Sequence, residues 1–96
     1  MPVKRSPKKV RLRGKAIRSL DDFYSQIAPK LRFPDYFGRN LDALWDVLTT
    51  DVQGPVELVW EESEDSKKSM GKDFEKVSVL LKDVEKERGD FKVSFR

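Results

Sequence analysis

The chain has 96 residues, with no cysteine and no histidine, and its 20 Lys and Arg against 17 Asp and Glu give a formal net charge of +3. This length predicts one compact domain and no second folded one. Without Cys or His the chain cannot form a disulfide, a zinc-finger site or a thiol nucleophile, and it lacks the usual general base near neutral pH. No apolar run approaches the roughly 20 residues of a membrane span, and the charged amino terminus lacks the apolar core of a secretory signal, so we expect a cytoplasmic protein.

The excess positive charge is concentrated at the amino terminus. Residues 1–9 contain four Lys or Arg, two Pro and no acid, whereas residues 10–96 carry a formal charge of −1. Nothing in the first segment can be buried at a regular period. We therefore predict a flexible basic arm over residues 1–9 and a nearly neutral folded domain over residues 10–96.

The first elements of the domain follow from two patterns. Apolar and basic residues alternate over residues 10–13, which predicts a short strand. Ser19 and Asp22 have the spacing of a capping box and predict the start of a helix. Pro29 should end that helix near Ala28. Its apolar stripe of helical period is Leu20, Phe23, Tyr24, Ile27 and Leu31.

A loop with an unusual density of aromatic residues leads into a second helix. Phe33, Tyr36 and Phe37 lie within five residues, which is more than a simple connector requires. Asn40 is a favourable N-cap for the helix that follows, and Gly54 and Pro55 end the segment. The apolar stripe of this helix is Leu41, Leu44, Trp45 and Leu48.

The second half of the chain predicts two more strands and a last helix. Residues 56–60 and 91–95 alternate as strands, and between them a helical stripe starts near a capping Asp73 and ends at Gly89. Residues 61–73 are polar, with Met70 as their only large apolar side chain, and predict a short solvated helix or an ordered loop. Strands separated by helices favour an α/β fold: a small three-stranded parallel sheet with three to four packed helices.

Two pairs of acids break a local rule of helix stability. Asp42 and Asp46 on the second helix, and Asp83 and Glu87 on the last, stand at i and i+4. Such a pair of like charges costs about 0.2–0.5 kcal/mol, and sequences often break local rules at functional surfaces. The alternative is that these acids only solvate an outer face. Trp45 is open to two interpretations as well, an interface anchor or plain core packing.

These residues do not predict an enzyme. Glycosidases need two carboxylates facing each other across a cleft, and two-metal nucleases need several converging on their ions, whereas these acids lie on successive turns of exposed helices. The basic arm resembles a phosphate-contacting segment, but no motif that reads DNA or RNA follows it. Nucleic-acid binding is therefore a less favoured alternative.

Residues 34–49, PDYFGRNLDALWDVLT, closely resemble the signature of the barstar family of intracellular ribonuclease inhibitors. That signature runs Pro, acid, Tyr, aromatic, Gly, any residue, then Asn-Leu-Asp-Ala-Leu-Trp-Asp. The resemblance extends without a gap from about Val10 to Arg96. It implies a barstar-like fold and a protein that plugs the active site of a cationic, barnase-type ribonuclease, with acids standing in for RNA phosphates.

The resemblance also implies roles for the matched positions. Asp46 would be the main plug and meet the basic side chains of the enzyme, and Asp42 would pair with a cation. Tyr36 would stack against the catalytic region, and Trp45 would support the helix face. Further contact or scaffold positions are Phe37, Gly38, Asn40, Thr49, Asp83 and Glu87, of which Asp83 replaces a Glu and Glu87 is a peripheral acidic contact.

Several positions depart from the family pattern. Arg39 stands where the best-known member is acidic, and Asp51 stands where it has Trp, so the charge pattern at the rim differs. Ser63 and Ser69 replace apolar anchors of the third helix. The cognate enzyme therefore need not be barnase itself.

The sequence thus predicts an inhibitor without a cofactor whose partner is a secreted or toxin-type cationic ribonuclease. We expect it to be a cytoplasmic protein that is monomeric when free. One alternative is an immunity or regulatory protein for a toxin that is not a ribonuclease, and another is a nucleic-acid binder that uses the basic arm.

Overall fold

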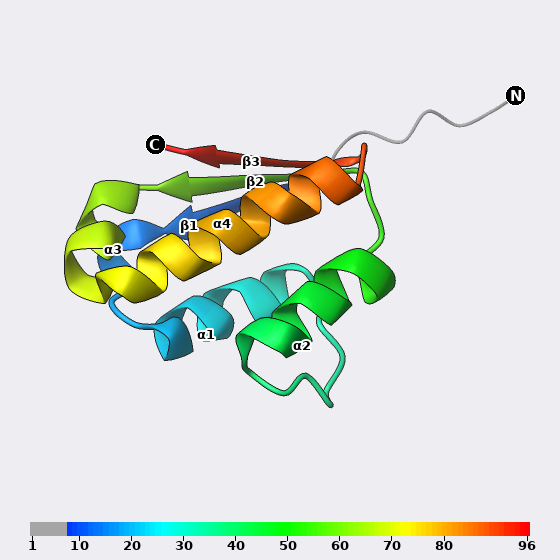
Figure 1. Ribbon diagram of the computed structural model, residues 1–96, viewed down its shortest axis with the longest axis horizontal. Coiled ribbons are helices and arrows are strands. Elements are labelled where there is room, and N and C mark those ends of the chain that lie inside the picture. The colour runs from blue at the N-terminus through cyan, green and yellow to red at the C-terminus, as the bar shows by residue number, and fades with distance from the viewer. Residues whose placement is uncertain (1–7) are drawn as a thin grey trace, which may run out of the picture.

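Three parallel strands with helices packed on one face make up residues 8–96, the part of the chain that the computed structural model describes (Figure 1). In chain order the elements are β1 (Lys8–Arg13), the 3-10 turn η1 (Gly14–Ala16), α1 (Leu20–Lys30), α2 (Leu41–Asp46), the π-helical turn η2 (Val47–Asp51), β2 (Val56–Glu61), α3 (Ser63–Met70), α4 (Lys72–Glu87) and β3 (Phe91–Phe95). This architecture confirms the predicted α/β fold.

The sheet has the order β1-β2-β3, and both pairings are parallel. Leu58 of the central strand pairs with Val10 on one side and Val93 on the other, and all three side chains are buried. Because side chains alternate across a strand, the neighbouring basic residues of β1 lie on the open face of the sheet. The alternation in the sequence therefore predicted which face the helices cover.

Strand β1 begins at Lys8, two residues before the predicted start of the fold at Val10. The Lys8 N–H donates a 2.9 Å hydrogen bond to the Pro55 carbonyl oxygen, and Lys8 is in register with Val56. Backbone pairing needs no apolar side chain, which is why hydrophobic alternation did not mark this end. The predicted basic arm covers residues 1–9, and residues 1–7 lie outside the described part of the chain.

Helix α1 has the predicted N-terminal cap, and it ends later than predicted. The Ser19 hydroxyl accepts from the Asp22 N–H at 3.1 Å, while the Asp22 carboxylate accepts from the Arg18 N–H at 3.0 Å, one residue before the donor of a capping box. The helix continues through Pro29 to Lys30. A proline in the last turn removes only one donor, and the Leu31 N–H still bonds to the Ile27 carbonyl oxygen.

Helix α3 corrects the prediction of a merely solvated segment, because two of its serines are buried. The Trp60 indole N–H donates to the Ser66 hydroxyl at 3.0 Å, and this hydroxyl donates to the Gly14 carbonyl oxygen at 2.7 Å. Ser63 donates through its hydroxyl to the Arg96 carbonyl oxygen at 3.0 Å. These serines join α3 to the sheet by hydrogen bonds, so hydrophobic periodicity could not reveal them.

Helix α4 begins at Lys72 after Gly71, whose φ is 58°, so the predicted N-cap at Asp73 is wrong. Gly71 turns the chain sharply from α3 into α4 in the left-handed region, where glycine is favoured. The buried stripe of α4 is as predicted, with Phe74, Val77, Leu81 and Val84 inside and Leu80 packed at the edge of the core.

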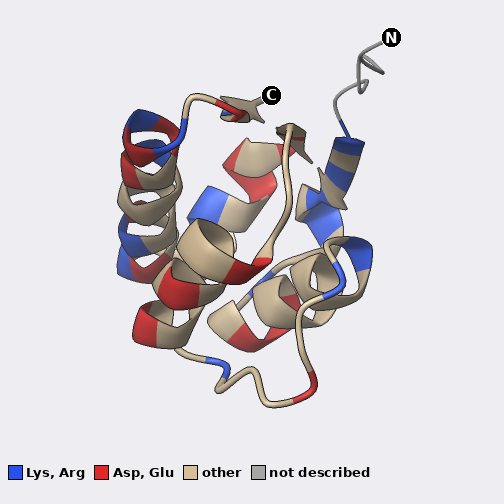
Figure 2. Cartoon of the chain, turned by 90° about the vertical axis from the view of Figure 1, so that its right-hand side faces the viewer, with Lys and Arg blue, Asp and Glu red and all other residues tan. Residues whose placement is uncertain are grey.

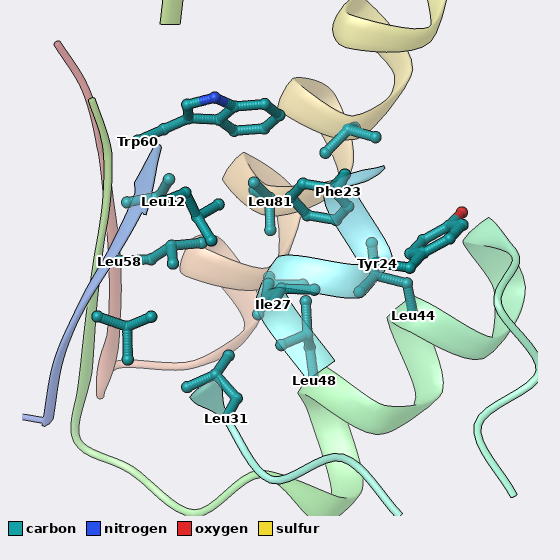
Figure 3. Packing of buried hydrophobic residues seen from close by; sticks show 14 of the residues in the cluster. Leu12, Phe23, Tyr24, Ile27, Leu31, Leu44, Leu48, Leu58, Trp60 and Leu81 are labelled. Atoms are coloured by element: carbon teal, nitrogen blue, oxygen red, sulfur yellow. The ribbon is translucent and has the colours of Figure 1, made fainter. Parts of the chain in front are cut away.

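The core lies between the sheet and helices α1, α2 and α4 (Figure 3). The Trp60 ring stacks on Phe23 with 5.1 Å between ring centroids. Leu44 and Leu48 point from the second helical segment into the same cluster and are fully buried. Burial of this face fixes the orientation of α2 and leaves its opposite face in solvent.

Candidate functional site

Asp42 and Asp46 lie on the solvent face of α2, one turn apart, as the sequence predicts. Asn40 caps the helix, because its side-chain oxygen accepts from the Ala43 N–H at 2.8 Å. Within residues 8–96 neither carboxylate forms an ion pair. The two charges are therefore not neutralised within the described part of the protein.

The helix continues beyond Asp46 into η2, and hydroxyl groups hold this junction. The Thr49 hydroxyl donates to the Trp45 carbonyl oxygen at 2.7 Å, and the Thr50 hydroxyl donates to the Asp46 carbonyl oxygen. Trp45 is half-buried and packs against the core. Core packing therefore accounts for part of this side chain, and its use as an interface anchor stays a prediction.

The aromatic loop before α2 is divided between the core and the solvent. Phe37 packs edge-on against Tyr24 and Phe33, with ring centroids 5.5 and 4.8 Å apart. Tyr36 is 77% exposed, and its hydroxyl donates to Asp51 Oδ2 at 3.3 Å. The negative charge of Asp51, followed by desolvation and this hydrogen bond, raises the pKa of Tyr36 above its ordinary value of 10.0. The loop therefore presents one aromatic ring outward, beside the end of η2.

Arg39 has a positive φ of 51° and turns back onto α1. Its Nη2 donates to the Asp21 carboxylate at 2.5 Å and to the Ser25 hydroxyl at 3.1 Å, and its guanidinium lies 5.8 Å from the centroid of the Tyr24 ring. The positive charge at this rim position is thus paired with an acid of α1, and Arg39 fastens the loop to the domain. Gly38 accepts through its carbonyl oxygen from the Asn40 side chain at 3.3 Å, which closes the turn before α2.

The second acidic pair lies on the neighbouring helix. Asp83 and Glu87 are exposed on α4, and α4 packs against both α2 and η2. Figure 2 shows acidic segments along α2 and on α4. The structure thus places the helices that carry the two pairs side by side.

Sequence reasoning missed Arg88, whose side chain is only 14% exposed. Its Nη1 donates to the carbonyl oxygens of Leu48 and Val52 at 2.7 and 2.8 Å, at the end of the helical segment that carries Asp46. The sequence does place a basic residue at the end of the last helix. It could not reveal the acceptors of Arg88, because Leu48 and Val52 lie 40 and 36 residues earlier in the chain.

Two features are absent from residues 8–96: a metal-binding group of side chains and a membrane-spanning helix. No group of three or more acids there is placed to hold a metal ion. None of the helices there has the length and apolar character needed to cross a membrane.

Comparison with known proteins identifies the family. Residues 8–96 match the family model described as Barstar (barnase inhibitor). The chain belongs to the barstar family. The Bacillus subtilis (strain 168) protein named "Putative ribonuclease inhibitor YrdF" is 34% identical over 87 residues, which cover 90% of this chain and 96% of that protein. The family match begins at Lys8, where β1 begins, and confirms the resemblance predicted from residues 34–49.

Proposed function

We propose that this barstar-family protein inhibits a cationic, barnase-type ribonuclease by occluding its active site with α2 and the loop before it. Asp46 enters the site in place of an RNA phosphate, Asp42 pairs with a cation beside it, and Tyr36 packs against the catalytic region. The observation that carries the proposal is the pair of exposed carboxylates on α2, which form no ion pair within residues 8–96 and lie on the face opposite the buried Leu44.

The electrostatics of the free protein support this mechanism. A carboxylate without an internal partner has no ion pair to break before it binds, so its attraction to a basic active site is fully available. Acids on one surface also speed association with a cationic protein through long-range attraction. Asp83 and Glu87 on the adjacent α4 extend this surface as peripheral contacts.

The remaining matched residues hold the contact surface rather than supply its charge. Asn40 caps α2, and Thr49 bonds to the Trp45 carbonyl oxygen. Phe37 and Gly38 fix the loop on which Tyr36 stands. A preformed surface loses little conformational freedom on binding, which favours affinity. The proposal includes a monomeric free state and a cytoplasmic location, as expected for an intracellular inhibitor.

The direct test is to titrate the protein into a barnase-type ribonuclease and to follow RNA cleavage. We expect cleavage to stop near one equivalent. Asp46→Ala should weaken inhibition by about thirtyfold or more, which is typical for loss of a charged side chain that becomes buried at the centre of an interface. Asp65→Ala is the matched control, because Asp65 is an exposed acid on α3 at the other end of the molecule from α2 (Figure 1).

Other outcomes separate the alternatives. Unchanged cleavage at stoichiometric protein would exclude a barnase-type ribonuclease as the partner and favour a toxin with another activity. A nucleic-acid binder should lose affinity on removal of residues 1–7 and show steep salt dependence. An inhibitor that works through α2 should tolerate that truncation.

A further inference from the structure

Tyr36 and Asp51 join two parts of the site that are far apart in the chain. The Tyr36 hydroxyl donates to Asp51 Oδ2 at 3.3 Å, which bridges the tip of the aromatic loop and the end of η2. Both residues are exposed. Their hydrogen bond therefore lies on the surface, at the end of the helical turn that follows α2.

The backbone on each side of this bridge is fixed independently. Next to Tyr36, Phe37 packs against Tyr24, and its N–H bonds to the Pro34 carbonyl oxygen at 3.0 Å. Next to Asp51, the Val52 N–H bonds to the Val47 carbonyl oxygen at 3.0 Å, and the Val52 carbonyl oxygen accepts from the Arg88 guanidinium at 2.8 Å. The bridge thus connects two anchored segments, and only the two side chains remain to be ordered.

We propose that Asp51 is a positioning residue that holds the exposed ring of Tyr36 in the orientation in which it meets the partner. The use of the ring for binding rests on the proposed function. Asp51 is also a position where this chain departs from the best-known family member, so this device belongs to this chain and to close relatives that share the acid.

The ring that Asp51 holds favours one class of side chain. The π face of a tyrosine attracts the cationic side chain of an Arg or Lys. A ring already held in place also loses less rotational freedom on binding than a free one. The partner side chain that meets the Tyr36 ring should therefore be a cation.

The bridge is tested first in the free protein by ultraviolet titration of the tyrosines between pH 8 and 12. Tyr36→Phe identifies the signal of Tyr36, because Tyr24 is the other of the two tyrosines in the chain. Asp51→Ala and Asp51→Asn should both bring the pKa of Tyr36 down toward its ordinary value, since the charge of Asp51 is the main cause of its elevation. Asp65→Asn, the control for loss of an exposed acid, should leave it unchanged. An unchanged pKa in Asp51→Ala would overturn the inference.

The second measurement is the χ1 rotamer population of Tyr36. A role of Asp51 that is purely structural and does not involve Tyr36 would leave this population unchanged. NMR coupling constants of Tyr36 should report one dominant χ1 rotamer in the unmodified protein and in Asp51→Asn, which retains an acceptor. Asp51→Ala should give rotamer averaging. Equal averaging in all three proteins would contradict a positioning role.

The third measurement is a double-mutant cycle in inhibition of a barnase-type ribonuclease. Asp51→Ala should weaken inhibition about three- to tenfold, the cost of ordering one free side chain, and much less in the Tyr36→Phe background. An equal loss in both backgrounds would show that Asp51 acts directly on the partner and would overturn the inference. If the unmodified protein does not bind the ribonuclease, the proposed function fails, and the titration and rotamer data still decide whether Asp51 holds Tyr36.

Discussion

Arg88 Nη1 donates a 2.7 Å hydrogen bond to the Leu48 carbonyl oxygen and so ties the end of α4 to the helical segment that carries Asp46. The same guanidinium holds the Asp90 carboxylate through Nε and Nη2, at 2.8 and 3.0 Å. Gly54 leaves room for this pair, because a Cβ at that position would overlap the Asp90 carboxylate. Two segments that are distant in the sequence, residues 48–54 and residues 88–90, therefore meet at one side chain.

The first prediction concerns this contact. Arg88→Met should lower the free energy of unfolding by about 2 kcal/mol, because charge-assisted hydrogen bonds to two largely enclosed carbonyl oxygens are lost. The measurement is urea denaturation at neutral pH. Lys86→Met, which removes an exposed base from the last turn of the same helix, should change stability far less. Equal effects of the two substitutions would show that Arg88 contributes only helix-end charge.

The second prediction follows from Asp90. Its hydrogen bonds to Arg88 hold the pKa of this carboxyl below its ordinary value of 3.8. A carboxyl whose pKa is lower in the folded than in the unfolded state stabilises the fold above the unfolded pKa, and this contribution disappears as the pH falls through the folded pKa.

Asp90→Asn should therefore destabilise the protein by a constant amount between pH 5 and 7, and the difference from the unmodified protein should shrink below about pH 4. Urea denaturation at a series of pH values from 2 to 7 measures it. Asp65→Asn serves as the control, since Asp65 has no ion pair in residues 8–96. A stability difference that stays the same down to pH 2 would exclude the linkage.

The elements that sequence reasoning predicted are those that depend on local periodicity. The stripes of α1, α2 and α4, the caps at Ser19 and Asn40 and the alternation of β1 are present, whereas β2 also buries Val59 on its other face. Each of these signals lies within one element, where side-chain spacing and the first turn decide the outcome. The acids of α2 could be placed on its outer face for the same reason.

The features that were missed depend on contacts between distant segments. Ser66 is polar in sequence and fully buried in the fold because its acceptor at Gly14 lies 52 residues away. The acceptors of Arg88 and the Tyr36 to Asp51 bridge are likewise set by tertiary packing. Hydrophobic periodicity does not depend on hydrogen bonds between distant residues, so only the assembled fold reveals them.

The third prediction tests the buried serine. Ser66→Ala should destabilise the fold by about 2 kcal/mol, because it leaves the buried Trp60 indole N–H without a partner and removes one of the two hydrogen bonds to the Gly14 carbonyl oxygen, which still accepts from the Ile17 N–H. Thermal and urea unfolding measure this loss. Ser69→Ala on the same helix is the matched control, since Ser69 is exposed and should be near neutral. Comparable stability of the two variants would rule out a structural role for the hydroxyl.

The fourth prediction tests the close approach of η1 to the end of β2. Gly14→Ala should cost about 3 kcal/mol or more, because a Cβ there would overlap the backbone oxygens of Glu61 and Glu62, which cannot easily move. Gly89→Ala is the control, since a Cβ at Gly89 meets nothing within 4 Å. Urea denaturation of both variants should give a large loss for the first and little change for the second. A tolerated Gly14→Ala would mean that the backbone at this junction can move apart.

The last prediction separates stability from binding in the acidic helix. Asp42 and Asp46 repel each other across one turn of α2, at a cost of about 0.2–0.5 kcal/mol for an i, i+4 pair of like charges. Asp46→Asn removes this repulsion, so the free energy of unfolding should rise by a few tenths of a kcal/mol, while inhibition of a barnase-type ribonuclease should weaken strongly because the plugging charge is gone. Paired urea curves and inhibition titrations measure the two effects on the same preparations. Asp65→Asn should leave inhibition unchanged, because Asp65 lies on α3, away from α2 and the proposed contact surface, and it should not raise the free energy of unfolding, because the helix dipole favours an acid in the first turn. Stability and inhibition that fall together in Asp46→Asn would instead show that the carboxylate supports the fold, and the proposed division between a stable buried face and a binding face would be wrong.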